Sequence, residues 1–305
     1  METLMRKLKG IYALVALIGV FFLLLTGCTP QKEKSDKLHI VTSLNFYGEA
    51  AEAVVGKYGT VDKIINGPNV DPHDFEPTTK TAKSVAKADV IVYNGLGYDS
   101  WMQRLVKADS EAGVTKINVG QAIMGKKLTD NPHVWYDYRT MPRLAYKLAD
   151  TFAKKDPDHR KQYAKNAARY VKSLAKIETQ IKQLKANRQE SRVDVSEPVF
   201  DYALTKMGYR INNSHFALSV ENGSDPTAKD IRQMQNDIKQ RKIAFFVNNP
   251  QASDPVVKNM VKLAHKHQVP VLNVTETQPS NKTYLEWMTA QYAQVAKIQK
   301  KESKS

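Results

Sequence analysis

The sequence of 305 residues contains a single cysteine, Cys28, and this scarcity excludes two kinds of site. One thiol cannot form an internal disulfide bond, and it cannot supply the several thiolates of a zinc finger or an iron–sulfur cluster. Glycine and proline are also sparse, with 14 and 13 residues, so the chain is neither fibrous nor of low complexity. With 42% hydrophobic residues, a chain of this length can form one large domain or two of moderate size.

Long apolar runs are lacking except near the N-terminus, from Ile11 to Leu25, just after a cluster of basic residues. About 15 residues are short for a membrane-spanning helix, which needs about 20, but they suit the apolar part of a signal peptide. The sequence Leu-Thr-Gly-Cys at 25–28 resembles the bacterial lipobox, where cleavage leaves a lipid-bearing cysteine. We therefore expect a signal peptide at 1–27, lipidation of Cys28 and a polar tether at 28–37. The alternative is an ordinary secretory signal with a chance cysteine.

The charge balance is strongly basic, with 46 Lys and Arg against 31 Asp and Glu and a formal net charge of +15. A basic surface suits a protein held at the outer face of an anionic membrane. Nucleic-acid binding is the other explanation for such a charge, but an exported protein seldom meets nucleic acid, and the sequence has no recognition motif. We expect no nucleic-acid partner.

Strand-like and helix-like segments alternate on both sides of one long helical pattern. From about His159 to Leu184, apolar residues recur at spacings of three and four, which predicts a helix of about 40 Å. Before this helix, the expected strands are 38–44, 61–65, 89–93 and 116–119. After it, the expected strands are 193–195, 210–212, 244–247 and 269–274. Helical patterns separate the strands, and this alternation is typical of parallel sheets covered by helices on both faces.

The sequence thus predicts an α/β fold of two lobes, each a mostly parallel sheet flanked by helices, joined by one long spine helix. The expected boundaries are an N-terminal lobe at 38–156, the spine at 157–189 and a C-terminal lobe at 190–305. A coiled coil is the alternative for the long helix. We also expect Pro226 to be the first residue of a helix.

Four expected strand ends carry residues that can bind a metal: His73, His133, Glu197 and Glu276. In open parallel sheets, ligands gather beyond the carboxyl ends of the strands. Each residue alone has an ordinary explanation, such as a surface turn, a favourable helix N-terminus or a solvated loop. The joint pattern is more telling, since two Pro-His turns lie in one lobe and two strand-end acids in the other. The prolines stiffen both turns, which lowers the cost of presenting a ligand.

The motifs together resemble a known family. The lipobox, Asp-Pro-His-Asp-Phe-Glu-Pro-Thr at 71–78, Asn-Pro-His-Val-Trp at 131–135, the spine and the C-lobe acids are similar to the metal-specific solute-binding proteins of bacterial ABC importers. This is family nine of the solute-binding proteins, and it comprises manganese and zinc receptors. The resemblance covers essentially the whole chain in order.

The resemblance implies one metal ion between the lobes, held by two residues from each. Position by position, the ligands would be His73, His133, Glu197 and Glu276. The family usually has Asp where this chain has Glu276, so Asp201 and Glu221 are the substitutes to test next. Two neutral imidazoles and two carboxylates would neutralise a divalent cation. Four acids near the histidines in sequence are expected to orient their rings, namely Asp71, Asp74, Glu76 and Asp137.

The implied function is a non-catalytic receptor that captures a metal outside the cell and delivers it to an ABC permease and its ATPase. The protein would be a monomer, anchored to the outer face of the cell membrane through Cys28. A carboxylate-rich site without thiolate favours Mn²⁺, and Zn²⁺ is the second candidate. Zinc receptors often carry a His-rich loop in the first lobe, whereas residues 97–129 contain no histidine.

Two other functions remain open, a secreted zinc-dependent hydrolase and a receptor for an organic ligand such as a siderophore. A hydrolase needs an open coordination position and a general base, and the sequence has no HExxH or GxSxG motif. A siderophore receptor would use an aromatic or arginine-lined cleft. Some relatives are described as adhesins, which the sequence does not test. The other histidines are expected to be structural: His39, His159, His215 in a loop, His265 and His267.

Overall fold

The computed structural model describes residues 37–305, apart from residues 69, 71, 109–112, 252–253 and 304–305. The predicted signal peptide, Cys28 and all of the tether except Lys37 lie outside the described residues. Two four-stranded sheets form the framework, and every strand pair in them is parallel. None of the helices in the described part of the chain combines the length and the hydropathy that a membrane crossing requires.

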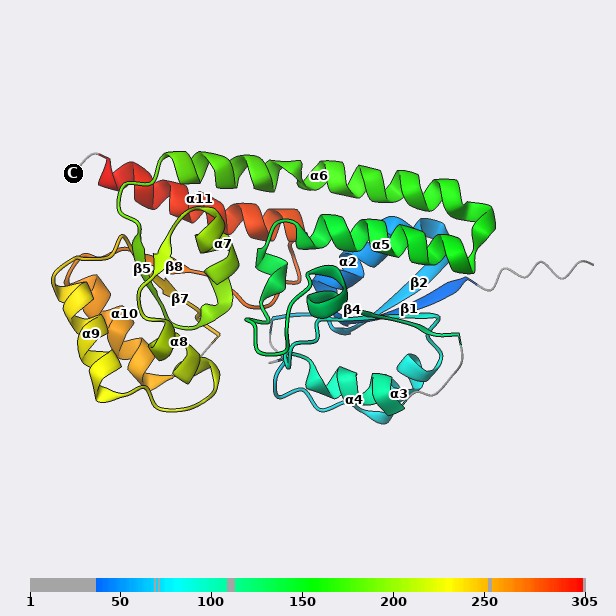
Figure 1. The fold of residues 1–305 in the computed structure, drawn as a ribbon, viewed down its shortest axis with the longest axis horizontal. Helices are drawn as coiled ribbons and strands as arrows, with labels where there is room; N and C mark the ends of the chain where they lie inside the picture. The colour runs from blue at the N-terminus through cyan, green and yellow to red at the C-terminus, as the bar shows by residue number, and fades with distance from the viewer. Residues whose placement is uncertain (1–36, 69, 71, 109–112, 252–253, 304–305) are drawn as a thin grey trace, which may run out of the picture. The chain divides into compact units, whose positions relative to one another are not determined.

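The first sheet has the strand order β2-β1-β3-β4. Its strands are β1 (Leu38–Leu44), β2 (Gly59–Ile65), β3 (Val90–Tyr93) and β4 (Thr115–Asn118). The central strands β1 and β3 are mostly apolar and buried, which explains why the sequence pattern predicts them as strands. Its helices are α2 (Asn45–Val55), α3 (Thr79–Ala86), α4 (Ser100–Ala108) and α5 (Thr140–Lys155). Helices α2 and α5 lie on one face of this sheet, and α3 and α4 on the other (Figure 1).

The second sheet repeats this arrangement, with the order β6-β5-β7-β8. Its strands are β5 (Arg192–Val195), β6 (Arg210–Ile211), β7 (Phe246–Asn248) and β8 (Val271–Asn273). Its helices are α7 (Asp201–Lys206), α8 (Ser214–Glu221), α9 (Ala228–Lys239), α10 (Pro255–Lys266) and α11 (Tyr284–Glu302). The predicted α/β fold with two parallel sheets is confirmed.

The predicted spine is α6 (Arg160–Ala186), which packs against α5 and α2 of the first lobe and against α11 of the second (Figure 1). Near its start, the Asn166 side-chain amide donates a hydrogen bond of 2.9 Å to the Val54 carbonyl. Near its end, the Gln299 amide donates one of 2.8 Å to the Leu184 carbonyl. The helix therefore contacts elements of both lobes, as the spine interpretation predicts and a simple coiled coil would not.

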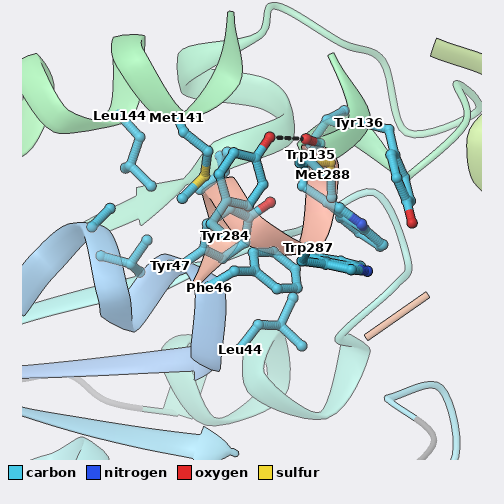
Figure 2. Close-up of a cluster of buried hydrophobic side chains, with 14 of the residues drawn as sticks. Leu44, Phe46, Tyr47, Trp135, Tyr136, Met141, Leu144, Tyr284, Trp287 and Met288 are labelled. Carbon is cyan, nitrogen blue, oxygen red and sulfur yellow. Dashed lines mark hydrogen bonds between the residues drawn. The ribbon is translucent and has the colours of Figure 1, made fainter. Parts of the chain in front are cut away.

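An aromatic cluster joins the first residues of α2 and α11 with the short 3-10 turn Val134–Tyr136 (Figure 2). The Phe46 ring lies 5.1 Å from Trp135 and 5.7 Å from Trp287, between ring centroids. The Tyr284 hydroxyl donates a hydrogen bond of 2.6 Å to the Trp135 carbonyl. Because this turn begins directly after His133, the aromatic core fixes the backbone that presents that histidine.

Two predicted elements are wrong. His215 lies in helix α8 and not in a loop, because Phe216, Ala217 and Val220 bury one face of this short helix. Pro226 is not the first residue of α9, since Thr227 is its N-cap. The Thr227 hydroxyl accepts from the Asp230 backbone N–H, and the Asp230 carboxylate accepts from the Thr227 N–H, so this capping box starts the helix at Ala228.

Candidate metal centre

His73 lies in the loop between β2 and α3, with 36% of its side chain exposed. The loop is held by α4, because the Trp101 indole N–H donates a hydrogen bond of 3.1 Å to the Pro72 carbonyl. The buried Tyr98 ring meets the His73 ring edge to face, with centroids 4.7 Å apart. A loop residue is thus given a defined position by aromatic packing beneath it.

His133 is completely buried, and its ring orientation is fixed by Asn131. The Asn131 carboxamide oxygen lies 2.9 Å from the His133 backbone nitrogen and 2.8 Å from ring Nδ1. With the proton on Nδ1, the lone pair of Nε2 points away from Asn131, and Nε2 makes no hydrogen bond. A buried polar atom without a hydrogen bond requires an explanation, and this tautomer is the one that binds metals through Nε2.

The acids expected to orient the histidines do not do so in the described residues. Asp137 is held by Arg139, whose Nε donates to Asp137 Oδ1 at 2.9 Å. This pairing lowers the Asp137 pKa although burial alone would raise it. Asp74 and Glu76 are exposed, and Asp71 lies outside the described residues. The orienting residue at His133 is therefore an amide, Asn131, which belongs to the recognised motif but was not predicted for this role.

Glu276 follows β8 and reaches both histidines. Its Oε1 lies 3.4 Å from His73 Nε2 and 3.6 Å from His133 Nε2, and 13% of its side chain is exposed. Burial alone would raise the Glu276 pKa, but the two imidazoles outweigh it and hold that pKa far below its usual range. In return the nearby carboxylates raise the His133 pKa, against the lowering effect of burial. The nitrogen and oxygen ligand atoms of His73, His133 and Glu276 all lie within 4.8 Å of one another.

The other predicted acids take different positions. Glu221, the last residue of α8, places its Oε1 3.7 Å from His133 Nε2 and 3.9 Å from His73 Nε2. The Glu197 carboxylate instead accepts a hydrogen bond of 2.9 Å from the Asn249 amide. Within the described residues it makes no ion pair with either imidazole at 4.0 Å or less. Burial raises the pKa of Glu197, and likewise that of Asp201, to about 7.

A cavity of about 600 Å³ opens onto these groups from solvent, lined by His73, Glu197, Glu221, Asn249 and Glu276 among others. His73 and three glutamate carboxylates line this cavity, and Nε2 of the buried His133 lies 3.7 Å from Glu221 and 3.6 Å from Glu276. These groups fit a divalent cation, because the donors are nitrogen and oxygen and the negative charge balances the ion. The structure thus brings together His73, His133 and Glu276, adds Glu221, and leaves Glu197 beside them on Asn249.

Residues 40–298 match the family model described as zinc-uptake complex component A, periplasmic. The chain belongs to this family. Relatives include the manganese-binding lipoprotein MntA of Halalkalibacterium halodurans, 30% identical over 193 residues, or 61% of this chain and 64% of MntA. The manganese ABC transporter substrate-binding lipoprotein PsaA of Streptococcus pneumoniae is 26% identical over 263 residues, or 80% of this chain and 83% of PsaA.

Solved structures show the same fold. The periplasmic zinc-binding protein TroA from Treponema pallidum superposes with a TM-score of 0.70 at 17% identity, over 85% of this chain and 98% of TroA. FpvC from Pseudomonas aeruginosa in complex with Mn²⁺ superposes with a TM-score of 0.70 at 20% identity, over 88% of this chain and 100% of FpvC. The family resemblance drawn from the sequence motifs is confirmed.

Proposed function

We propose that this chain is the substrate-binding component of an ABC importer for a divalent transition metal, anchored outside the cell membrane. The observation that carries the proposal is the buried Nε2 of His133. It has no hydrogen bond, and it faces two carboxylates and shares them with a second imidazole. The names of the relatives, which are metal-binding lipoproteins of ABC transporters, support the same function.

The proposed chemistry is capture and release and not catalysis. Two histidines and two acids would fill a four-coordinate shell, whereas a hydrolytic metal keeps one position open for water. Delivery then requires a permease and its ATPase as partners, and the lipid on Cys28 would keep the receptor near them.

We propose Mn²⁺ as the preferred metal and Zn²⁺ as the second. Zn²⁺ binds nitrogen and oxygen donors more strongly at equal geometry, so a preference for Mn²⁺ must come from the number of hard oxygen donors. Three glutamates line this cavity, and no thiolate lies among the described residues, since Cys28 is outside them.

Metal analysis tests the proposal. The purified protein is stripped with chelator, reloaded with excess Mn²⁺ or Zn²⁺ and desalted, and its metal content is measured by mass spectrometry. We expect about one equivalent in the wild type and little in His73→Ala or His133→Ala, because each substitution removes a ligand. His265→Ala on α10 is the matched control and should bind like the wild type. Equal retention in all variants, or no binding by the wild type, contradicts the proposal.

A further inference from the structure

We propose that the second lobe carries a second binding site, separate from the metal centre, for an organic anion with an apolar part. The site is a cavity of about 750 Å³ at one end of the second sheet. Its ligand class is a carboxylate or phosphate ester attached to an aliphatic chain, whether free or part of a phospholipid. The inference goes beyond the proposed metal transport and does not rest on it.

The cavity lies at the opposite end of the strands from the metal centre. Glu190, Ala244 and Pro270 line it and precede β5, β7 and β8, whereas Asn249 and Glu276 of the metal cavity follow β7 and β8. These strands have three or four residues each, which separates the two cavities by about 10–13 Å. One wall is the last part of α11, which runs beside the end of α6 (Figure 1). The volume lies within the usual range for small-molecule sites, about 300–1,000 Å³.

The rim of this cavity is basic, unlike the lining of the metal cavity. Arg241, Lys297 and Lys301 line it and are exposed. Glu190 is the one acid among the described lining residues, and its carboxylate accepts hydrogen bonds of 2.7 and 2.9 Å from the backbone N–H groups of the next two residues. Three cations around one carboxylate with its own partners attract an anion and repel a second metal ion.

The buried part of the lining is apolar. Ile243, Val269 and Ile298 are 4%, 3% and 8% exposed, and Pro270 and Val271 are half-buried. An inorganic anion would leave this surface in contact with water, whereas an aliphatic chain would cover it. The combination of a basic rim and an apolar wall therefore fits an anion that carries an apolar part.

Two residues of the lining hold a backbone conformation that glycine usually adopts. Arg241 and Gln268 have φ values of 52° and 58°, directly after the C-caps of α9 and α10. In both places the N–H of the following residue donates to a helix carbonyl at 2.9 Å, which is the Schellman pattern. Three non-glycine residues in the described part of the chain have a positive φ, and two of them line this cavity. Side chains kept at strained positions indicate a function for them.

Arg241 is the residue suited to recognise the anionic group. Its Nη2 donates a hydrogen bond of 3.3 Å to the Gln268 carbonyl. A guanidinium has five N–H donors, so this contact orients the group and leaves donors for a carboxylate or a phosphate. Arginine binds such groups through two parallel hydrogen bonds, which are stronger than those between neutral partners.

Titration with defined probes tests the ligand class. Isothermal titration calorimetry measures the affinity of the purified protein for dihexanoyl phosphatidylglycerol, kept below its micelle concentration, and for hexyl phosphate. Tighter binding of the first indicates a membrane lipid, and tighter binding of the second a free organic anion. Zwitterionic dihexanoyl phosphatidylcholine and inorganic phosphate should each bind at least about tenfold more weakly. Equal binding of these two controls overturns the inference.

Substitutions at two arginines of the same lobe test the location. Arg241→Gln should weaken binding of the anionic probes by at least about tenfold. Arg232→Gln makes the same change at an exposed position of α9 outside the lining, and it should bind like the wild type. Arg241→Gly should also lose binding while raising the melting temperature, because glycine relieves the positive φ, so the loss is not due to unfolding. Wild-type affinity in Arg241→Gln, or an equal loss in Arg232→Gln, overturns the inference.

His133→Ala separates this site from the metal centre. The variant should lose the metal and bind the anionic probes with unchanged affinity, because the cavities lie at opposite ends of the strands. A wild type that binds metal but neither probe overturns this inference alone. A wild type that binds a probe but no metal overturns the proposed metal transport alone.

Discussion

Asp194 is a buried acid in the middle of the second sheet, and its protonation should control stability. It lies on β5 with no exposed surface, and burial and the nearby Asp237 raise its pKa to about 7. An unfolded aspartate titrates near pH 4, so between about pH 4 and 7 the folded state holds a proton that the unfolded state has lost. The contribution of this group to stability therefore falls as the pH rises through that window.

Asp194→Asn should remove this pH dependence, because the amide is neutral throughout. At pH 8 we expect the variant to have a free energy of unfolding higher than that of the wild type by about 2–4 kcal/mol, with the gain shrinking towards pH 4. Urea unfolding of both proteins at pH 4.5 and pH 8 measures the difference. A gain that is the same at both pH values would show that the charge of Asp194 is not its cause.

At the scale of single residues, the sequence was informative where a residue follows a strand. His73 and Glu276 lie in the loops after β2 and β8, His133 lies in the longer connection after β4, and the structure brings the three together. Glu221 was only an alternative because it ends a helix that the sequence did not predict. The role of Asn131 was missed because the choice between an amide and an acid as ring partner depends on side-chain geometry, which spacing does not contain.

At the scale of elements, the contact between α11 and the 3-10 turn Val134–Tyr136 should matter for both stability and binding. Tyr284→Phe removes the hydroxyl that donates to the buried Trp135 carbonyl at 2.6 Å. We expect a loss of about 1–3 kcal/mol in the free energy of unfolding, because the carbonyl loses its donor without access to water. We also expect weaker metal binding, since the turn begins directly after His133. Chemical denaturation and metal titration measure the two effects.

The control for this substitution is Tyr146→Phe on α5, whose side chain is half exposed. It makes the same chemical change away from the turn and should leave both properties unchanged. A Tyr284→Phe protein that matches this control in both measurements would contradict the proposed role of the hydrogen bond.

The elements that the sequence predicted are those with a strong apolar pattern. β1 and β3 are mostly apolar and buried, and α6 has a regular stripe of buried residues. Strands and helices with such patterns can be predicted from one sequence alone. Helix α8 has only eight residues, and its N-cap is Asn213, whose side chain donates a hydrogen bond to the Val195 carbonyl of β5. Its stability comes from tertiary contacts, and local propensity gives little sign of it.

At the scale of the whole molecule, the rhythm of elements predicted two parallel sheets but not how their loops meet. The Asn45 amide donates to the Gln278 carbonyl at 3.1 Å, across 233 positions of sequence. The Gln251 amide donates to the Pro68 carbonyl at 2.8 Å, across 183 positions. Such contacts depend on the packing of complete lobes, so no local sequence pattern predicts them. The geometry of the candidate metal centre could not be predicted from the sequence for the same reason.

The contacts between the lobes lead to a prediction about metal binding as a whole. Because the proposed ligands come from both lobes, a bound ion stabilises the folded state and should raise the melting temperature. At a free metal concentration 100 times the dissociation constant, the gain is about 2.7 kcal/mol. His133→Ala should show no metal-dependent rise in melting temperature.

Because α6 and the loop contacts join the lobes, small-angle scattering should show little change in the radius of gyration when the metal binds. A large contraction of the wild type would contradict the rigid-spine interpretation.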